Sequence, residues 1–135
     1  MKRPAQQVLL GVLLGACLCA CTTYQPPKLP PQQLAMVVPY ADSTEEQMYI
    51  DGVDGLAVSA GSAVNFHTDD LGVYLTPGRH SLNIRLRFGT RETGMKVWLV
   101  VQAGRKYRVE SLSDAYGFSA RVVDTVNGAV VGHSR

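Results

Sequence analysis

The chain has 135 residues, with 13 Lys and Arg, 11 Asp and Glu, three His and three Cys. This length is enough to bury the core of a single domain. Two of the basic residues, Lys2 and Arg3, stand at the extreme N-terminus, and without them 11 basic residues balance 11 acidic ones. A neutral chain of this kind lacks the basic surface of a nucleic-acid-binding protein, so we expect no nucleic acid among its partners.

The N-terminus has the organisation of an export signal. Lys2 and Arg3 precede a short apolar run over residues 8–16, which is too short to span a bilayer because a spanning helix needs about 20 apolar residues. The run leads into Leu18-Cys19-Ala20-Cys21, which resembles the lipobox of bacterial lipoproteins. The resemblance implies that residues 1–20 are a cleaved lipoprotein signal peptide.

Two cysteines fit this lipobox pattern. Leu14-Gly15-Ala16-Cys17 also matches it, but cleavage there leaves an apolar segment of only about seven residues, so we favour Cys21 and keep Cys17 as the alternative. The resemblance implies that Cys21 carries diacylglycerol and an acyl chain such as palmitate, and that Thr22, in place of Asp, directs the protein to the outer membrane. A single lipidated cysteine leaves the mature domain without disulfides.

Residues 21–33 are predicted to form the lipidated N-terminus and a Pro-rich tether. The two pairs Pro26-Pro27 and Pro30-Pro31 favour extended polyproline II, which rises about 3.1 Å per residue and would reach roughly 30 to 40 Å. We expect the tether to hold the domain away from the lipid. A Pro-rich ligand for the groove of a partner protein is the alternative.

Residues 34–135 alternate apolar and polar side chains with period two. Turn signals separate about seven to nine short strands, so the predicted fold class is all-β, a small antiparallel β-sandwich. We expect Pro39 to end the first strand or place it at an edge, and Asp51-Gly52 to form a turn. The predicted strands cover residues 34–38, 48–50, 63–66, 72–75, 81–88, 95–102, 107–112 and 118–123. The last of them runs on to residues 126–131, where Asn127-Gly128 is the strongest short hairpin signal in the chain.

Residues 81–88 give the clearest strand signal. Leu82, Ile84, Leu86 and Phe88 share one face, while Asn83, Arg85 and Arg87 share the other, as in a strand with one face on a core and one in water. Residues 95–102 are apolar on both faces, which predicts a central strand that is covered on both sides.

Charge is segregated along the chain. All charged residues from 42 to 70 are acidic, whereas those from 79 to 108 are mostly basic. Two opposed surface patches and neighbouring strands that neutralise each other both fit this pattern, and we favour the second.

Two turn motifs carry a family resemblance. Ile50-Asp51-Gly52, followed by Leu75-Thr76-Pro77-Gly78-Arg79-His80-Ser81-Leu82 and later Ala103-Gly104-Arg105-Lys106-Tyr107, resembles the pattern of PEGA-like bacterial surface domains and of small proteobacterial lipoproteins. The resemblance implies a β-sandwich in the cell envelope and brings no catalytic residue with it.

No residue pattern indicates an enzyme or a metal site. His67, His80 and His133 are too scattered for metal-ligand spacing, and we expect His80 to hydrogen-bond a loop or a neighbouring strand. Turn formation accounts for Asp51 and Asp54. We therefore expect no catalytic residue, no metal and no cofactor.

The predicted function is that of a lipid-anchored, periplasm-facing envelope protein that acts as a structural or accessory binding module. An envelope protein would bind at an edge strand or at the face bearing Arg85 and Arg87. The alternative is a glycan- or lipid-headgroup-binding module centred on Trp98, with Tyr74, Tyr107 and Tyr116 as possible neighbours. The candidate partner-binding residues are thus Arg85, Arg87 and Trp98.

Overall fold

The computed structural model describes residues 23–40, 46–58, 64–66 and 70–134. Cys17, Cys21 and the predicted signal peptide lie outside these ranges. Within them, no helix is both long and apolar enough to cross a membrane. The elements are the 3₁₀ helix η2 (Pro31–Gln33) and the strands β1 (Ala35–Tyr40), β2 (Glu46–Val53), β3 (Leu56–Ala57), β4 (Val64–Phe66), β5 (Asp70–Leu75), β6 (Gly78–Phe88), β7 (Arg91–Val101), β8 (Lys106–Asp114), β9 (Gly117–Asp124) and β10 (Val130–Ser134).

The predicted all-β class is confirmed, but the arrangement of the strands differs from the expected antiparallel sandwich. The strands join in one continuous sheet in the order β3-β2-β6-β7-β10-β9-β8-β1-β5-β4. The sheet is mixed, because β1 pairs with β8 in parallel and with β5 in antiparallel sense. By inserting between β8 and β5, β1 makes the hydrogen bonding continuous where a sandwich would have a gap between two sheets.

The number and length of the strands also differ from the prediction of seven to nine short ones. β6 and β7 each have eleven residues and pair along their whole length, whereas β3 and β4 have only two and three residues. The prediction over residues 63–66 coincides with β4, whereas β3 was missed because two residues are too few to display a period of two.

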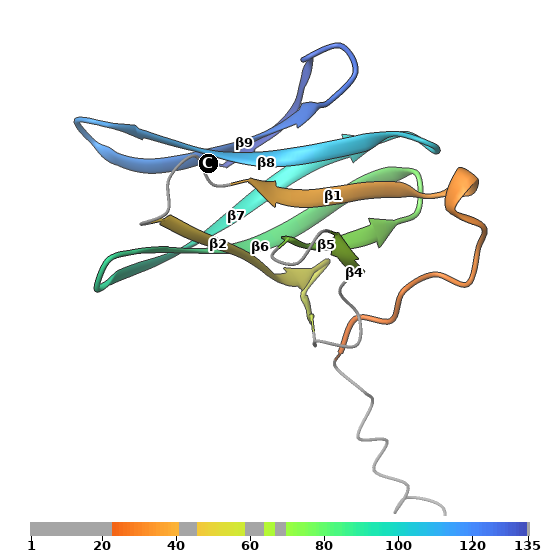
Figure 1. The fold of residues 1–135 in the computed structure, drawn as a ribbon, viewed down its shortest axis with the longest axis horizontal. Helices are drawn as coiled ribbons and strands as arrows, with labels where there is room; N and C mark the ends of the chain where they lie inside the picture. The colour runs from red at the N-terminus through yellow and green to blue at the C-terminus, as the bar shows by residue number, and fades with distance from the viewer. Residues whose placement is uncertain (1–22, 41–45, 59–63, 67–69, 135) are drawn as a thin grey trace, which may run out of the picture.

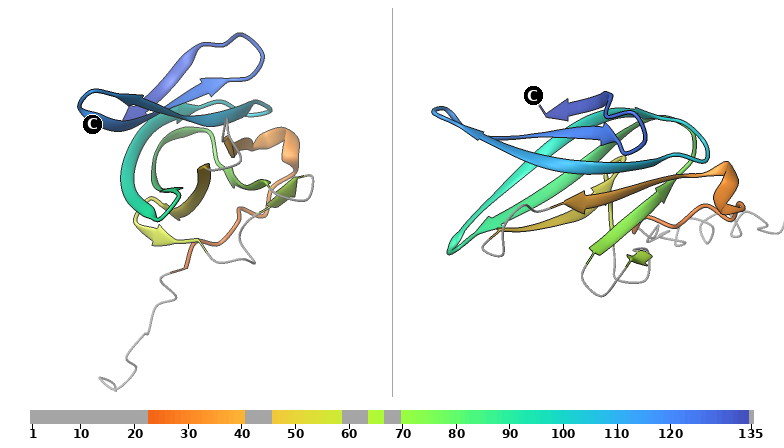
Figure 2. Two further views of the ribbon diagram at one scale, coloured as in Figure 1. Left: turned by 60° about the vertical axis from the view of Figure 1, so that its left-hand side comes forward. Right: turned by 45° about the horizontal axis from the view of Figure 1, so that its top comes forward.

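The sheet curls into a half-barrel around its own inner face (Figures 1 and 2). In the left view of Figure 2, the strands surround a common interior. Near the two ends of the sheet, β2 contacts β1 and β5. The inward rows supply the buried core, whose largest fully buried side chains are Tyr107, Leu75, Leu82, Ile84, Leu86 and Leu99.

Tyr24 closes the seam between the two ends of the sheet. Its amide donates to the carbonyl oxygen of Ala57 in β3 at 2.6 Å, and its hydroxyl donates to the carbonyl oxygen of Tyr74 in β5. Its side chain is only 9% exposed and belongs to the core cluster. Burial, reinforced by the nearby negative charge of Asp54, raises the pKa of the Tyr24 hydroxyl to about 12.

Part of the predicted tether is therefore docked on the domain. The predicted tether, residues 21–33, contains Tyr24. It ends next to Leu34, the first residue of the predicted domain, which is buried and whose carbonyl oxygen accepts the Gly104 amide at 2.9 Å. The expectation of an extended spacer followed from proline content alone. It did not consider that Tyr24, two residues before Pro26, packs its ring into the apolar seam of the sheet.

Pro39 lies within β1, although it was expected to end the strand or place it at an edge. The Met36 amide donates to the carbonyl oxygen of Arg105, the residue directly before β8. The amides of the residues two and four positions after Met36 therefore also face β8. The position of Pro39 faces the other neighbour, β5, whose pairing stops at Val37. Proline is tolerated because the missing amide falls where the ladder has no partner.

The tight turn lies at Asp54-Gly55, three residues beyond the predicted one at Asp51-Gly52. Asp54 and Gly55 have φ of 50° and 83°, the positive values that a two-residue hairpin requires and that Asp and Gly tolerate best. Asp51 and Gly52 are instead part of β2.

The Asp54 carboxylate connects this turn to β6. It accepts the Ser81 amide at 2.8 Å and lies 2.6 Å from Nδ1 of His80. Nε2 of His80 is 2.7 Å from the Thr76 carbonyl oxygen. The structural role expected for His80 is confirmed, because it joins the turn after β2 to the connection between β5 and β6.

Candidate functional site

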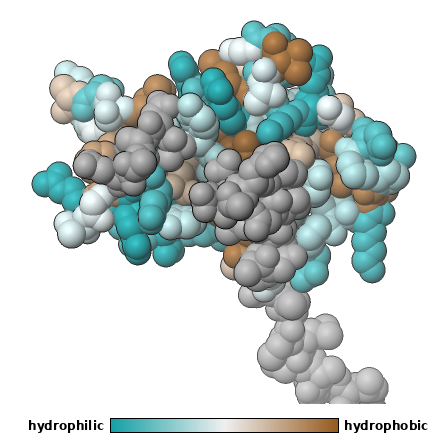
Figure 3. Space-filling view, in the orientation of Figure 1, coloured by the Kyte–Doolittle hydropathy of each residue, from teal (hydrophilic) through white to brown (hydrophobic). Residues whose placement is uncertain are grey.

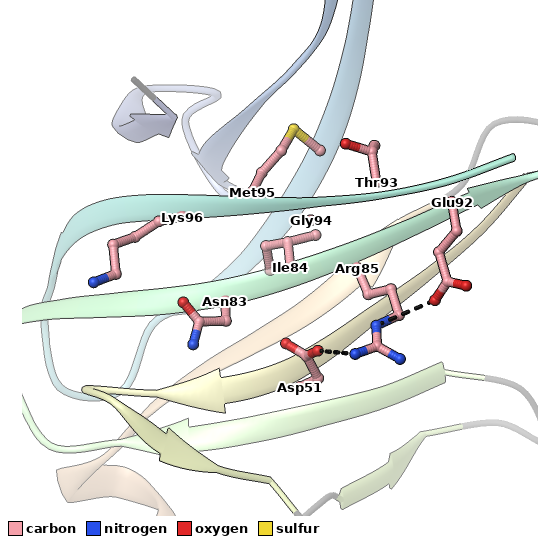
Figure 4. A pocket seen from close by; sticks show the side chains of 9 residues that line it. All are labelled: Asp51, Asn83, Ile84, Arg85, Glu92, Thr93, Gly94, Met95 and Lys96. Atoms are coloured by element: carbon pink, nitrogen blue, oxygen red, sulfur yellow. Dashed lines mark ion pairs between the residues drawn. The ribbon is translucent and has the colours of Figure 1, made fainter.

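The outer face of β6 and β7 carries all three residues predicted to bind a partner. Along these strands, inward side chains alternate with outward ones, and Arg85, Arg87 and Trp98 all point outward. Figure 4 shows Arg85 and Glu92 on the side of the sheet opposite to Met95 and Thr93. The alternation predicted for residues 81–88 therefore places Arg85 and Arg87 correctly.

Arg85 is held between two carboxylates. Its guanidinium lies 3.1 Å from Asp51 Oδ2 on β2 and 3.2 Å from Glu92 Oε1 on β7 (Figure 4). Arg87 lies 3.8 Å from the other oxygen of Glu92. The acidic and basic segments of the sequence are thus neighbours in the sheet here, which agrees with mutual neutralisation of adjacent strands.

The hollow beside Arg85 is wide and of mixed charge. It encloses about 670 Å³ above Gly94, which leaves a gap in the outer row of β7. Two cations, Arg85 and Lys96, and two carboxylates, Asp51 and Glu92, line it together with Asn83. Exposed ion pairs of this kind contribute little energy, and their charges cancel. Arg85 and Arg87 themselves are matched by Asp51 and Glu92, so the pair offers no net charge to an acidic partner.

A second hollow, of about 400 Å³, surrounds Trp98 on the same face of the sheet. Trp98 is 42% exposed, and Val100 and Val130 are 53% and 55% exposed. His133 stands opposite Trp98 across the β7–β10 pair, and Arg79 stands opposite Val100 across the β6–β7 pair. We call this area the Trp98 surface, and it consists of Arg79, Trp98, Val100, Val130, Val131 and His133.

The Trp98 surface exists because the outer face of β7 is uncovered. The apolar outer row of residues 95–102 predicted a strand covered on both sides, and this prediction is wrong: the inward Val97, Leu99 and Val101 are buried, but Trp98 and Val100 meet solvent. The Lys96 ammonium lies 5.3 Å from the centre of the Trp98 ring, where it makes a cation–π contact. The surface is therefore apolar at its centre and cationic at its margin.

The other aromatic residues suggested for a glycan site do not gather around Trp98. Tyr107 is fully buried, and its hydroxyl accepts the Gln102 amide at 2.9 Å. Tyr74 takes part in the Tyr24 seam, and Tyr116 stands at the exposed tip of the β8–β9 hairpin. Trp98 is thus the single aromatic residue of its surface among the described residues.

The face drawn in Figure 3 shows no large hydrophobic patch among its coloured residues. In Figure 3, brown hydrophobic residues form small areas between hydrophilic ones. The sheet edges also offer little to a partner strand, because β3 has two residues and Thr23 already pairs with Ala57 there. Edge-strand addition, one of the expected binding modes, has a poor template on this side.

The described ranges contain no group of three or more His, Cys, Asp or Glu residues that could hold a metal ion. His133 lies on the Trp98 surface and His80 is engaged with Asp54 and Thr76. The sequence reasoning identified Trp98 but missed Val100, Arg79 and His133, whose pairing across β6, β7 and β10 depends on register. No protein-family model, curated protein or solved structure matches this chain significantly.

Proposed function

We propose that this protein is a lipid-anchored outer-membrane protein, facing the periplasm, whose half-barrel serves as a structural or accessory module that binds another envelope protein through the Trp98 surface. The observation that carries the proposal is the exposure of Trp98 beside Val100 and Val130 on an uncovered strand face. It acts by binding and carries out no reaction of its own.

The chemistry of the Trp98 surface favours a protein partner. Interface energy concentrates in a few Trp, Tyr and Arg side chains that become fully desolvated, and Trp98 and Arg79 are of these types. Val100 and Val130 surround the indole with apolar area that gains free energy only when covered. Arg85 and Arg87 are exposed and paired with Asp51 and Glu92, so we assign them no direct part in binding.

Cys21 is the anchor, and Tyr24 fixes how far the domain stands from it. Three residue steps separate Cys21 from the docked Tyr24, and a fully extended chain covers at most about 10 Å over that length. The domain is therefore held close to the membrane, without the 30 to 40 Å spacing expected of a free Pro-rich tether. The resemblance of residues 75–82 to PEGA-like bacterial surface domains supports the same proposed assignment to the envelope.

Co-isolation of the full-length, tagged protein from its own cells after mild crosslinking tests this proposal. We expect a stoichiometric envelope protein that is lost with Trp98→Ala but retained with Tyr49→Ala, a control aromatic of similar exposure on β2. Cys21→Ala should release the protein from the membrane, and palmitate labelling should vanish with it. Labelling that disappears only in Cys17→Ala would overturn the choice of anchor and leave the binding surface intact.

A glycan or lipid headgroup at Trp98 is the alternative, because Arg79, Lys96 and His133 place cationic or hydrogen-bonding groups around one exposed indole. Trp98 is the chain's one tryptophan, so its fluorescence reports this surface directly. Saturable quenching by envelope glycans or anionic headgroups, absent in Arg79→Gln, would favour the alternative. The alternative would be excluded if these ligands left the fluorescence unchanged and the crosslinking experiment captured an envelope protein.

A further inference from the structure

The half-barrel opens at the end where the β6–β7 and β8–β9 hairpins turn. Phe88 and Phe118 face each other across this opening, with ring centres 6.4 Å apart and planes inclined by 39°. They continue the inward rows that bury Leu86 and Ala120 deeper in the core, yet they are 42% and 44% exposed. Two inward aromatic rings therefore border an entrance to the apolar interior, which we call the hairpin mouth.

A slot of about 310 Å³ lies in the hairpin mouth. Leu86, Phe88, Thr93 and Phe118 line it, with Arg91 and Glu92 at its rim. Its volume is at the lower end of the range for small-molecule sites, and apolar lining with few polar groups is typical of such sites. A water molecule takes up about 30 Å³ in the liquid, and a methylene group is of similar size, so the slot has room for about ten methylene groups. An alkyl chain of about that length therefore fits its volume.

Arg91 supplies the polar end of the site. Within the described part of the chain, the guanidinium of Arg91 has no ion pair or hydrogen bond. Five other arginines each have a carboxylate partner: Arg85, Arg87, Arg105, Arg108 and Arg121. Glu92, the neighbour of Arg91, is already engaged with Arg85 and Arg87 on the outer face. Among the described residues the guanidinium therefore has no carboxylate partner, and from its place on the apolar slot it complements the carboxylate of a ligand.

We propose that the hairpin mouth binds a medium-chain fatty carboxylate, with the alkyl chain packed against Leu86, Phe88 and Phe118 and the carboxylate on Arg91. The proposal is independent of the Trp98 surface and of the lipid anchor. The site and the seam lie at opposite ends of β2. At one end, Glu46 pairs with Phe88 of the hairpin mouth, and at the other end, Val53 pairs with Leu82 and is followed by the turn into β3. The mouth therefore points away from the Tyr24 end of the domain.

Photolabelling with decanoate that carries a diazirine and an alkyne tests the site in envelopes isolated from cells producing the full chain. We expect label on peptides containing residues 86–93 or 117–120, competed by plain decanoate and much less by neutral decanol. Arg91→Gln should lower labelling about tenfold, the loss expected for a charge-assisted bond. Phe118→Ala should lower it comparably, by removing one wall of the slot.

Matched controls separate the site from general effects. Arg87→Gln removes an arginine of the same strand pair on the outer face, and Leu112→Ala removes an exposed apolar residue of the same hairpin as Phe118. Both should label within twofold of the unaltered protein, and protease resistance shows whether every variant is folded. Three results would overturn the proposal: label spread over the whole chain, competition by decanol as strong as by decanoate, or labelling that Arg91→Gln leaves unchanged. A photoreactive residue in place of Phe118 that captures a protein, with decanoate unable to compete, would overturn it as well.

Discussion

The hydroxyl of Tyr24 donates a hydrogen bond to the carbonyl oxygen of Tyr74, fifty positions further along the chain. Together with the bond from the Tyr24 amide to Ala57, this contact joins strands near the opposite ends of one sheet. A curled sheet with two free ends would leave the core exposed along the seam. One residue from the N-terminal segment therefore completes the half-barrel and, in the lipid-anchored protein that we propose, limits the distance between the domain and Cys21.

Removal of the Tyr24 ring should destabilise the domain far more than removal of its hydroxyl. Tyr24→Ala deletes a buried aromatic side chain and should cost about 3 kcal/mol, whereas Tyr24→Phe loses one hydrogen bond worth about 1 kcal/mol. Urea unfolding measures both values. Tyr116→Ala, at a fully exposed tyrosine of the β8–β9 tip, should change stability by less than about 0.5 kcal/mol. Equal effects of Tyr24→Ala and Tyr116→Ala would contradict the seam.

Alkaline pH should weaken the seam through the same hydroxyl. The pKa of Tyr24 rises from 10.0 to about 12 in the folded protein, so between these values the folded state keeps a proton that the unfolded chain has released. Stability is then complete below pH 10 and falls as pH rises towards 12, by on the order of 2 kcal/mol. The difference in stability between the unaltered protein and Tyr24→Phe should shift by this amount. Parallel pH profiles would contradict the prediction.

The Asp54–His80 contact should show a coupling energy of about 1 kcal/mol in a double-mutant cycle. Asp54→Ala leaves both His80 Nδ1 and the Ser81 amide without their acceptor, which should cost roughly 1 to 3 kcal/mol. Asp54→Asn retains an acceptor for Ser81 and tolerates the positive φ, so it should cost less. If Asp54→Ala and Asp54→Asn unfold alike, the carboxylate contacts do not stabilise the turn.

Substitution by alanine should have opposite effects on stability at Gly132 in β10 and at Gly94 in β7. A Cβ on Gly132 would lie 2.3 Å from the Trp98 carbonyl oxygen and 2.6 Å from Leu99 Cβ, so Gly132→Ala must displace backbone and should cost about 2 kcal/mol or more. A Cβ on Gly94 meets nothing nearer than 4.0 Å, and Gly94→Ala should stabilise the strand by about 0.5 kcal/mol. Thermal unfolding of the two variants checks this ordering, and a neutral Gly132→Ala would contradict the register of β7 and β10.

The distance between domain and bilayer should depend on Tyr24. With lipid on Cys21, a fluorophore at residue 56, on the exposed edge strand β3 beside the seam, should be strongly quenched by acceptors in the membrane surface. Insertion of ten Gly and Ser residues between Thr22 and Thr23 should relieve the quenching without releasing the protein. Equal quenching with and without the insertion would show that the seam does not set the distance.

The sequence was a good guide wherever one strand face is buried and the other is solvated. Residues 81–88 became β6 with the predicted inward and outward rows, because alternation reports burial directly. The same reasoning failed for β7, because an apolar row in the sequence does not show whether other parts of the chain cover it. Trp98 and Val100 were predicted to be covered but are exposed in the structure.

Other features depend on contacts between distant segments. Nothing local in residues 34–40 reveals that β1 runs parallel to β8, or that Pro39 falls where pairing with β5 has stopped. Tyr24 stood in a segment whose prolines predicted an extended chain, and its partners Ala57 and Tyr74 become neighbours only after the sheet curls. Long-range register therefore set the limit of what could be predicted.

Site-specific photocrosslinking in living cells tests the central proposal most directly. A photoreactive residue in place of Val100 should form one dominant adduct with an envelope protein, and Cys21→Ala should reduce that adduct because the domain no longer reaches its membrane. The same residue in place of Arg87, on the neutralised part of the outer face, should form little or none. An abundant, folded protein that gives no adduct from Val100, or equal adducts from both positions, would contradict binding through the Trp98 surface.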